Sequence, residues 1–153
     1  MQIWRISNFA DLSGEGGLLA SGRWHSKGHR IIYLSDHPAS ALVEVLVNLE
    51  IDPDDFPESY QLLTIEVPDN VNFATIDPSQ LSADWQDNLA STRAIGDKWL
   101  IANDRALLRV PSAVVPLASN WLLNPVHSDL SRMRITDVIR APFDPRLFKI
   151  AQR

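Results

Sequence analysis

The sequence contains no cysteine. Its absence excludes thiol nucleophiles, redox-sensing thiols, iron–sulfur clusters and cysteine-based zinc sites. The chain also has no signal peptide, no N-glycosylation sequon and no apolar run of about 18 residues, the length that a membrane-spanning helix needs. The cytoplasm is therefore the expected location, and a carboxylate, an arginine and a hydroxyl are the tools left for chemistry.

A surplus of positive charge is also missing. The chain has 14 Lys+Arg against 19 Asp+Glu, a formal net charge of -5 and a pI of about 5.2. Because non-specific nucleic-acid binding needs a basic face, this balance argues against direct binding to DNA or RNA, although a small basic pocket remains compatible with it. With 153 residues and no internal repeat or Gly/Ser linker, residues 1–153 are expected to form a single domain.

The pattern of apolar residues predicts several β-segments around a few helices. Because strands and helices do not alternate strictly, the pattern favours an α+β fold over a Rossmann domain. A helix is expected from residue 37 to about residue 49, capped by Ser35 or Asp36 and with Pro38 in its first turn. The strands are expected at residues 2–7, 30–35, 60–67, 107–116 with a break at Pro111, and once or twice within 133–150. Residues 79–103 are expected to be helical in two pieces, and residues 11–22, 50–59 and 117–130 to be irregular.

The helix at 37–49 carries the first candidate for chemistry. Apolar residues cover one face and also part of the opposite side, so the helix is expected to be buried almost all round. One narrow polar stripe remains, made of His37, Ser40, Glu44 and Asn48. A carboxylate in this setting either pairs with a buried arginine or is held for chemistry. On its own, the pattern favours the ion pair for Glu44.

An arginine and two aromatic residues follow the glycine-rich stretch at 11–22. Arg23 lies beside flexible backbone, and its guanidinium group is suited to bind phosphate or carboxylate. Trp24 and Tyr33 could stack on an aromatic ligand. The alternative is a β-hairpin with a solvated arginine and two core aromatic residues.

Ser112 follows Pro111 at a stiff break between apolar segments. Its hydroxyl could donate to a ligand or bond to its own backbone, but the sequence around it is no G-x-S-x-G elbow. Ser112, His127 and Asp129 supply the residue types of a catalytic triad without fixed geometry. His25 and His29 have metal-ligand spacing but no third ligand, so no metal site is predicted.

Taken in order, these segments resemble one known family. Its N-terminal pattern is matched by Trp4-Arg5-Ile6, by S-G-R-W-H at 21–25, by Ile32-Tyr33-Leu34 and by A-L-V-E-V-L-V-N-L-E at 41–50. Its C-terminal pattern is matched by I-G-D-K-W-L at 95–100, V-P-S-A-V-V-P at 110–116 and N-W-L-L-N-P-V-H at 120–127. The chain resembles a RES-domain protein, a family named for an Arg, a Glu and a Ser, which here are Arg23, Glu44 and Ser112.

The resemblance implies a toxin of a type II toxin–antitoxin module that depletes cellular NAD+. The implied fold is similar to that of ADP-ribosyltransferase toxins. The implied partner is an Xre-like helix-turn-helix antitoxin, which would carry the DNA recognition, and a toxin homodimer within that complex is a further expectation. NAD+ would be the substrate, cleaved by hydrolysis or phosphorolysis, and neither a cofactor nor a metal is implied.

The resemblance also suggests a role for each site residue. Glu44 would stabilise the positive charge that develops on the ribose, and Arg23 would hold the pyrophosphate or the adjoining ribose. Ser112 would hydrogen-bond the substrate or orient Glu44. The expected substrate-binding residues are Trp24, Tyr33, Asn124 and His127.

Three alternatives remain open at this point. The same fold could transfer ADP-ribose to a protein. The chain could instead be a non-catalytic interaction module in which Arg23 and Glu44 form a buried ion pair. A hydrolase built on Ser112 and His127 is the third. The acidic run at 50–58 is expected to be a solvated loop or a contact to the partner.

Overall fold

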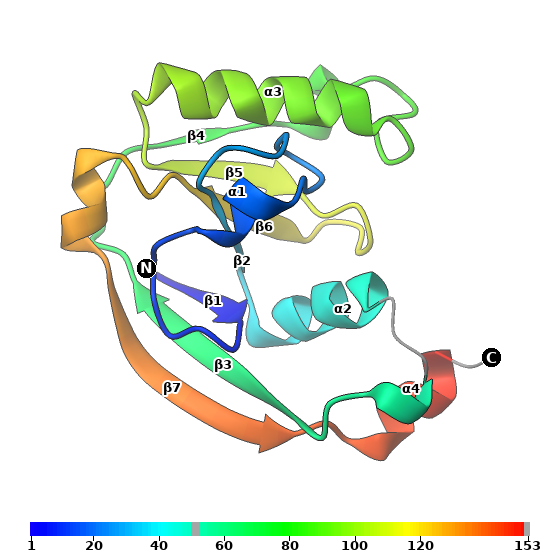
Figure 1. Ribbon diagram of the computed structural model, residues 1–153. Helices are drawn as coiled ribbons and strands as arrows, with labels where there is room; N and C mark the ends of the chain where they lie inside the picture. Colours follow the sequence, from blue (N-terminus) through cyan, green and yellow to red (C-terminus); the bar gives the residue numbers. More distant parts are fainter. Residues whose placement is uncertain (50–52, 152–153) are drawn as a thin grey trace.

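A computed structural model of the chain describes residues 1–49 and 53–151 (Figure 1). Within these residues, seven strands form one sheet in the order β4-β5-β6-β2-β1-β3-β7. All neighbouring strands are antiparallel except β4 and β5, which are parallel. The strands are β1 (Gln2–Ile6), β2 (Ile32–Ser35), β3 (Ser59–Glu66), β4 (Phe73–Thr75), β5 (Leu107–Pro111), β6 (Ser119–Leu123) and β7 (Arg134–Pro142).

Helices connect and cover the sheet, which confirms the α+β prediction. The α-helices are α1 (Gly16–Leu19), α2 (Pro38–Asn48), α3 (Leu89–Ala102) and α4 (Pro145–Ala151), and the short 3-10 turns are η1 (Pro53–Asp55), η2 (Pro78–Gln80) and η3 (Ser128–Arg132). Among the described residues, none of the helices has the length and apolar character needed to cross a membrane.

The register of the central strands places a row of residues on one face of the sheet. Tyr33 of β2 pairs with Leu122 of β6, which pairs with Leu108 of β5. Residues opposite each other in antiparallel strands share a face, and Leu108 and Leu122 pack with Trp99 of α3 in one core cluster. α3 therefore covers this face over β5 and β6, while α2 packs against β1 and β2 (Figure 1).

The opposite face of the sheet carries the second core cluster. Its members include Ile3, Leu34, Leu63, Ile65, Leu107 and Leu123, all of them buried. In β2, β5 and β6 the apolar residues thus divide between the two cores, as expected for strands covered on both faces. The polar groups of the candidate site lie on the α2 and α3 side.

Two predictions for the helix at α2 are wrong. Its N-cap is His37, whose Nδ1 accepts a hydrogen bond from the Ala39 backbone N–H at 3.0 Å. Ser35 is instead the last residue of β2. The helix is not buried all round: Ala41 is its buried residue, and the Val47 side chain is 58% exposed. The reason is that α2 packs on the sheet with one side only.

The segment boundaries after residue 78 also differ from the prediction. Residues 79–103 contain the end of η2 and then α3, which begins only at Leu89. β5 ends at Pro111, and β6 begins at Ser119, inside the stretch predicted to be irregular. Between them the Ser112 N–H donates to the Ala118 carbonyl at 3.0 Å, so the apolar residues after Ser112 form a turn rather than a strand.

The C-terminal region contains one strand, β7, followed by the helix α4 instead of a second strand. The predicted loop at 50–59 contains η1 and the start of β3. Its residues 50–52 lie outside the described part of the chain.

Candidate active site

The carboxylate of Glu44 is held by two side chains from distant segments. Its Oε1 accepts a hydrogen bond from the Ser112 hydroxyl at 2.8 Å and another from Asn120 Nδ2 at 2.9 Å. Its Oε2 accepts none from a described residue. One oxygen is therefore fixed by the protein, and the other is free to face a ligand.

The hydroxyl of Ser112 has no bonding capacity left. It donates to Glu44 and accepts from the backbone N–H groups of Val114 at 3.1 Å and Val115 at 3.0 Å. A hydroxyl has one proton and two lone pairs, so all three are used. Of the two roles expected for Ser112, this geometry supports orienting Glu44. It also leaves the hydroxyl engaged by a carboxylate rather than by a histidine, unlike the triad of the hydrolase alternative.

Asn120 is a site residue that the sequence analysis missed. The Ser35 hydroxyl donates to its Oδ1 at 3.2 Å, which turns the amide so that its NH₂ group faces Glu44. Ser35 and Asn120 are partners in the β2–β6 register. Asn120 is the first residue of the segment N-W-L-L-N-P-V-H at 120–127, which was noted for the family resemblance. From that segment the sequence analysis selected Asn124 instead.

Arg23 makes no ion pair with Glu44 or with any other described carboxylate. Its Nη1 donates to the Gln86 carbonyl at 2.8 Å, and its guanidinium carbon lies 5.9 Å from the centre of the Trp85 ring. The buried Arg23–Glu44 ion pair of the interaction-module alternative is therefore wrong for this structure. The other guanidinium N–H groups have no acceptor among the described residues and can bind an anion.

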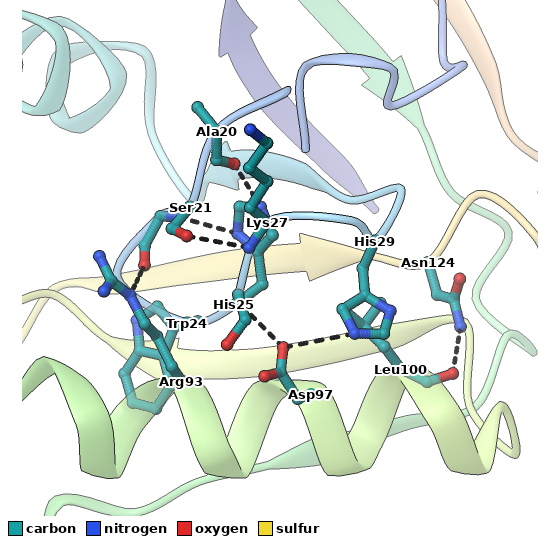
Figure 2. Close-up of polar contacts among 12 residues, drawn as sticks. Ala20, Ser21, Trp24, His25, Lys27, His29, Arg93, Asp97, Leu100 and Asn124 are labelled. Carbon is teal, nitrogen blue, oxygen red and sulfur yellow. Dashed lines mark hydrogen bonds and ion pairs between the residues drawn. The ribbon is translucent and has the colours of Figure 1, made fainter. Parts of the chain in front are cut away.

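The backbone around Arg23 is anchored to α3. Thr92 Oγ1 donates to the Arg23 carbonyl at 2.6 Å, and Arg93 Nε donates to the Gly22 carbonyl at 2.8 Å. One turn further on, Asp97 Oδ1 accepts from the Ser26 backbone N–H at 2.8 Å. Figure 2 shows Arg93 and Asp97 reaching from α3 towards this segment. A helix face thus fixes the backbone that presents Arg23.

Gly96 allows the segment to lie directly on α3. A Cβ at this position would be 1.6 Å from the Trp24 carbonyl oxygen. Only a residue without a side chain fits this approach. The close packing of Trp24 on α3 therefore explains why the I-G-D-K-W-L stretch has a glycine at this position.

A buried network positions Tyr33 beneath the same segment. His25 Nε2 lies 2.9 Å from the Ala20 carbonyl, which only accepts, so this nitrogen carries the proton. Its Nδ1 then accepts from the Tyr33 hydroxyl at 2.7 Å and from the Gly22 N–H at 3.2 Å. The Tyr33 oxygen in turn accepts from the Trp24 N–H at 3.1 Å. The hydroxyl is therefore a fixed neutral donor.

Burial shifts the titration of both rings in this network. It raises the pKa of Tyr33 to about 12, and it lowers the pKa of His25 below its ordinary value. In each case loss of solvent disfavours the charged form. Near neutral pH the pair is uncharged, as the hydrogen bonds require.

These groups converge on one cavity of about 360 Å³, whose lining includes Arg23, Tyr33, Glu44 and Asn120. A smaller cavity of about 220 Å³ beside α2 shares Tyr33, Glu44 and Asn120 with it. A cationic group, an aromatic ring and a held carboxylate thus face one space. This set can bind an anion-bearing ligand and stabilise positive charge close to Glu44.

Three expected substrate-binding residues lie elsewhere or are covered. Trp24 belongs to the lining of the cavity that contains Glu44, but its side chain is 2% exposed and packs against Trp85 with ring centres 6.1 Å apart, so it offers little surface for stacking. Asn124 is 1% exposed, and its amide donates to the Leu100 carbonyl at 3.3 Å at the end of α3 (Figure 2). His127 caps η3 by accepting from the Asp129 N–H at 3.0 Å.

Neither Asn124 nor His127 lines the cavity that contains Glu44. The reason is the length of β6, because Asn120 lies near its beginning and Asn124 follows its end.

The pair formed by His25 and His29 has other partners than a metal ion: His29 Nε2 lies 3.9 Å from Asp97 Oδ1 (Figure 2). In the described part of the chain, no group of three or more acidic or histidine side chains is placed to hold a metal ion.

Comparison with known proteins gives consistent matches over the whole chain. The family model described as RES domain matches residues 2–144. "Toxin Res" of Pseudomonas putida KT2440 is 45% identical over 97% of this chain and 100% of its own length. "Prs ADP-ribosylating toxin" of Sphingobium sp. strain YBL2 is 34% identical over 97% of this chain and 98% of its own length.

A solved structure shares the fold at low sequence identity. It is the Mycobacterium tuberculosis MbcT–MbcA toxin–antitoxin complex, in which the matching chain has a TM-score of 0.74 and 20% identity. The match covers 97% of this chain and 87% of that one. At this identity, the likeness supports the architecture of the domain.

Proposed function

This chain belongs to the RES domain family, and from that premise we propose that it is a toxin that cleaves the nicotinamide–ribose bond of NAD+. The observation that carries the proposal is the Glu44 carboxylate, which lines the cavity and is held through one oxygen by Ser112 and Asn120. The names of the relatives support the toxin role. Depletion of NAD+ would arrest growth.

Glu44 acts on the charge that forms as the bond breaks. The electron pair of the C1′–N bond leaves with nicotinamide, and positive charge develops on the ribose. A carboxylate fixed in advance stabilises this charge without reorganising during the reaction. An acceptor oxygen from water or phosphate then bonds to C1′ and loses its proton. Nicotinamide is a good leaving group, so no strong general acid is required.

Arg23 and Tyr33 bind and orient the substrate. The guanidinium group of Arg23 pairs with the pyrophosphate through the N–H groups that no described residue uses. The ring of Tyr33 forms a wall of the cavity beside Glu44, and its hydroxyl is fixed by His25. The aromatic wall suits the flat nicotinamide ring.

An antitoxin is the proposed partner. The structural neighbour is a chain of a toxin–antitoxin complex, and the family resemblance suggests an Xre-like antitoxin for this chain. The net charge of -5 fits a toxin that leaves DNA binding to its partner. A toxin homodimer within the complex remains a proposal, testable by the mass of the co-purified complex.

Transfer of ADP-ribose to a protein is the second candidate. One relative is named as an ADP-ribosylating toxin, and the first half of that reaction is the same bond cleavage. Only the acceptor differs, because a protein side chain replaces water or phosphate. Glu44 would have the same role in both reactions.

The test follows nicotinamide release and NAD+ loss with the purified wild type and with Glu44→Gln. The wild type should consume NAD+, and Glu44→Gln should be slower by at least a hundredfold. Glu58→Gln is the matched control, since it removes the same charge at an exposed position outside the cavity and should retain wild-type activity. If the wild type leaves NAD+ intact, the cleavage proposal is wrong. If Glu44→Gln matches the wild type, the role of Glu44 is wrong.

The products then separate the acceptors. Free ADP-ribose indicates hydrolysis, and a phosphate-dependent product indicates phosphorolysis. Label carried from NAD+ onto a macromolecule indicates ADP-ribosyl transfer. A non-catalytic interaction module predicts neither NAD+ loss nor toxicity on expression.

A further inference from the structure

A second cavity lies beside the one that contains Glu44. It has a volume of about 440 Å³ and is lined by the ends of β4 and β5, by Trp85 and Gln86, and by the turn from Ser112 to Ser119. Glu44 and Tyr33 are not part of its lining. The chemistry assigned to Glu44 therefore leaves this cavity without a role.

Arg23 lies at the boundary between the two cavities. It lines the first cavity, while its guanidinium carbon lies over the Trp85 ring at 5.9 Å from the ring centre and its Nη1 donates to the Gln86 carbonyl. Trp85 and Gln86 both line the second cavity. Ala113 and Val114 line both cavities and form a shared wall. The two spaces are thus neighbours, with a cationic group between them.

This order of groups matches the chemical order of a dinucleotide. NAD+ has two nucleosides joined by a pyrophosphate, which carries the negative charge at its middle. We propose that the second cavity binds the adenosine half of NAD+, with the pyrophosphate at Arg23 and the nicotinamide riboside beside Glu44. The inference rests on the proposed function, because it assigns the other half of the same substrate.

The walls of the second cavity have the mixed character that an adenosine needs. Ile76, Val110 and Leu117 provide apolar surface, and Thr75, Gln86 and Ser119 provide polar side chains. Adenine offers two apolar faces, and its ribose offers hydroxyls. Ligand sites commonly combine such apolar surface with a few polar groups.

The backbone conformation and the exposure of Leu117 independently indicate that this turn binds a ligand. Its backbone has a φ of 68°, in the left-handed region that residues other than glycine seldom adopt. Its side chain is fully exposed although it is a large apolar group. Backbone strain of this kind gathers at ligand-binding segments. An adenine ring in the second cavity would cover this side chain.

The test measures the binding of AMP and of nicotinamide mononucleotide, which each represent one half of the substrate, by calorimetric titration. Leu117→Asn removes the apolar contact with a residue that tolerates the backbone, and Ala118→Phe fills the second cavity. Both should weaken AMP binding at least fivefold and leave the mononucleotide unaffected. Glu44→Gln should leave AMP binding unchanged. With NAD+ as substrate, both turn variants should lose kcat/KM to a similar extent, while cleavage of the mononucleotide is retained.

Wild-type AMP affinity in both turn variants would overturn the inference, as would absence of AMP binding to the wild type at millimolar concentration. A parallel loss of mononucleotide binding would also overturn it, because it would indicate general disruption. AMP binding does not depend on cleavage. A wild type that binds AMP here but leaves NAD+ intact would refute the proposed function alone, and one that cleaves NAD+ with unaffected turn variants would refute the subsite alone.

Discussion

At the scale of single residues, the position of the Glu44 carboxylate depends on two donors that reach the same oxygen. Ser112 is itself bonded to the backbone of the following turn, and Asn120 is turned by Ser35. Each donor is therefore held in place by hydrogen bonds that do not involve Glu44. Hydrogen bonds to a charged group are worth about 1.5–3 kcal/mol, so the loss of either donor should be measurable.

Replacing Asn120 with alanine should slow the reaction more than it weakens substrate binding. We expect Asn120→Ala to lower kcat about tenfold, which corresponds to about 1.4 kcal/mol of transition-state stabilisation, with KM within twofold. Ser35→Ala should have a smaller effect in the same direction, because it only frees the amide to rotate. Steady-state nicotinamide release measures both constants. Asn72→Ala, at an exposed position, is the control, and an unchanged kcat in Asn120→Ala would contradict the positioning role.

Burial of His25 should make the free energy of unfolding depend on pH. Burial lowers the pKa of His25 in the folded state, whereas the unfolded chain has a value of about 6.5. Above that value neither state binds the proton, and below it the unfolded chain takes up a proton that the folded protein refuses. The free energy of unfolding should therefore fall as pH is lowered from about 7 to about 5. Urea denaturation should show this fall in the wild type and a shallower one in His25→Gln. Equal slopes would exclude His25 as the cause.

Most residues of the candidate site could be predicted from the sequence, but one residue that holds Glu44 was missed. Residue type and family resemblance pointed to Glu44 and Ser112, and the structure brings them into direct contact. Asn120 was missed because its role depends on the β2–β6 register, which pairs it with Ser35 across 85 positions of the chain. Such non-local pairing leaves no trace in a local pattern.

At the scale of elements, α3 acts as the platform for the segment that carries Arg23. Thr92, Arg93, Gly96 and Asp97 all face this segment. Their spacing places them on one side of a helix. The I-G-D-K-W-L stretch was noted for its resemblance, but its function as a support follows only from the packing of the helix against a segment about 70 positions earlier.

A side chain at Gly96 should disturb both stability and activity. The Cβ of Gly96→Ala would clash with the Trp24 carbonyl, so the segment must move away from α3. We expect a loss of about 1–3 kcal/mol in the free energy of unfolding and a rise in KM for NAD+, because Arg23 moves with its backbone. Urea denaturation and steady-state kinetics measure the two effects. Lys98→Ala changes an exposed residue of the same helix and should alter neither, and wild-type stability in Gly96→Ala would contradict the close packing.

The elements that were predicted well are those with a strong local pattern. The stretch at β1 alternates, those at β2 and β3 are rich in apolar residues, and each strand was expected within two residues of its observed bounds. The turn after Ser112 was mistaken for a strand because its residues are apolar. It is closed by the bond from Ser112 N–H to Ala118 and by the bonds to the Ser112 hydroxyl, which composition does not reveal.

At the scale of the whole molecule, the candidate site is assembled from four separate parts of the chain. Arg23 comes from the segment on α3, Glu44 from α2, Ser112 from the turn after β5, and Asn120 from β6. The two helices cover the same side of the sheet, α2 over β1 and β2 and α3 over β5 and β6. A bound dinucleotide would connect Arg23 with Glu44, which make no ion pair with each other in the described part of the chain.

This arrangement predicts that NAD+ stabilises the domain as one unit. Glu44→Gln is the variant of choice, since it retains an acceptor for Ser112 and Asn120 but should consume the ligand at least a hundredfold more slowly. At about 100 times its Kd, a ligand adds about 2.7 kcal/mol to the free energy of unfolding. For a domain of this size that raises Tm by roughly 5–10 °C.

Hydrogen exchange should slow in α2 and α3 together, because the ligand bridges both. Nicotinamide alone, which cannot span the two cavities, should give a smaller shift and protect only the side of Glu44. Protection confined to one helix at saturating NAD+ would show that the ligand does not bridge the two covers.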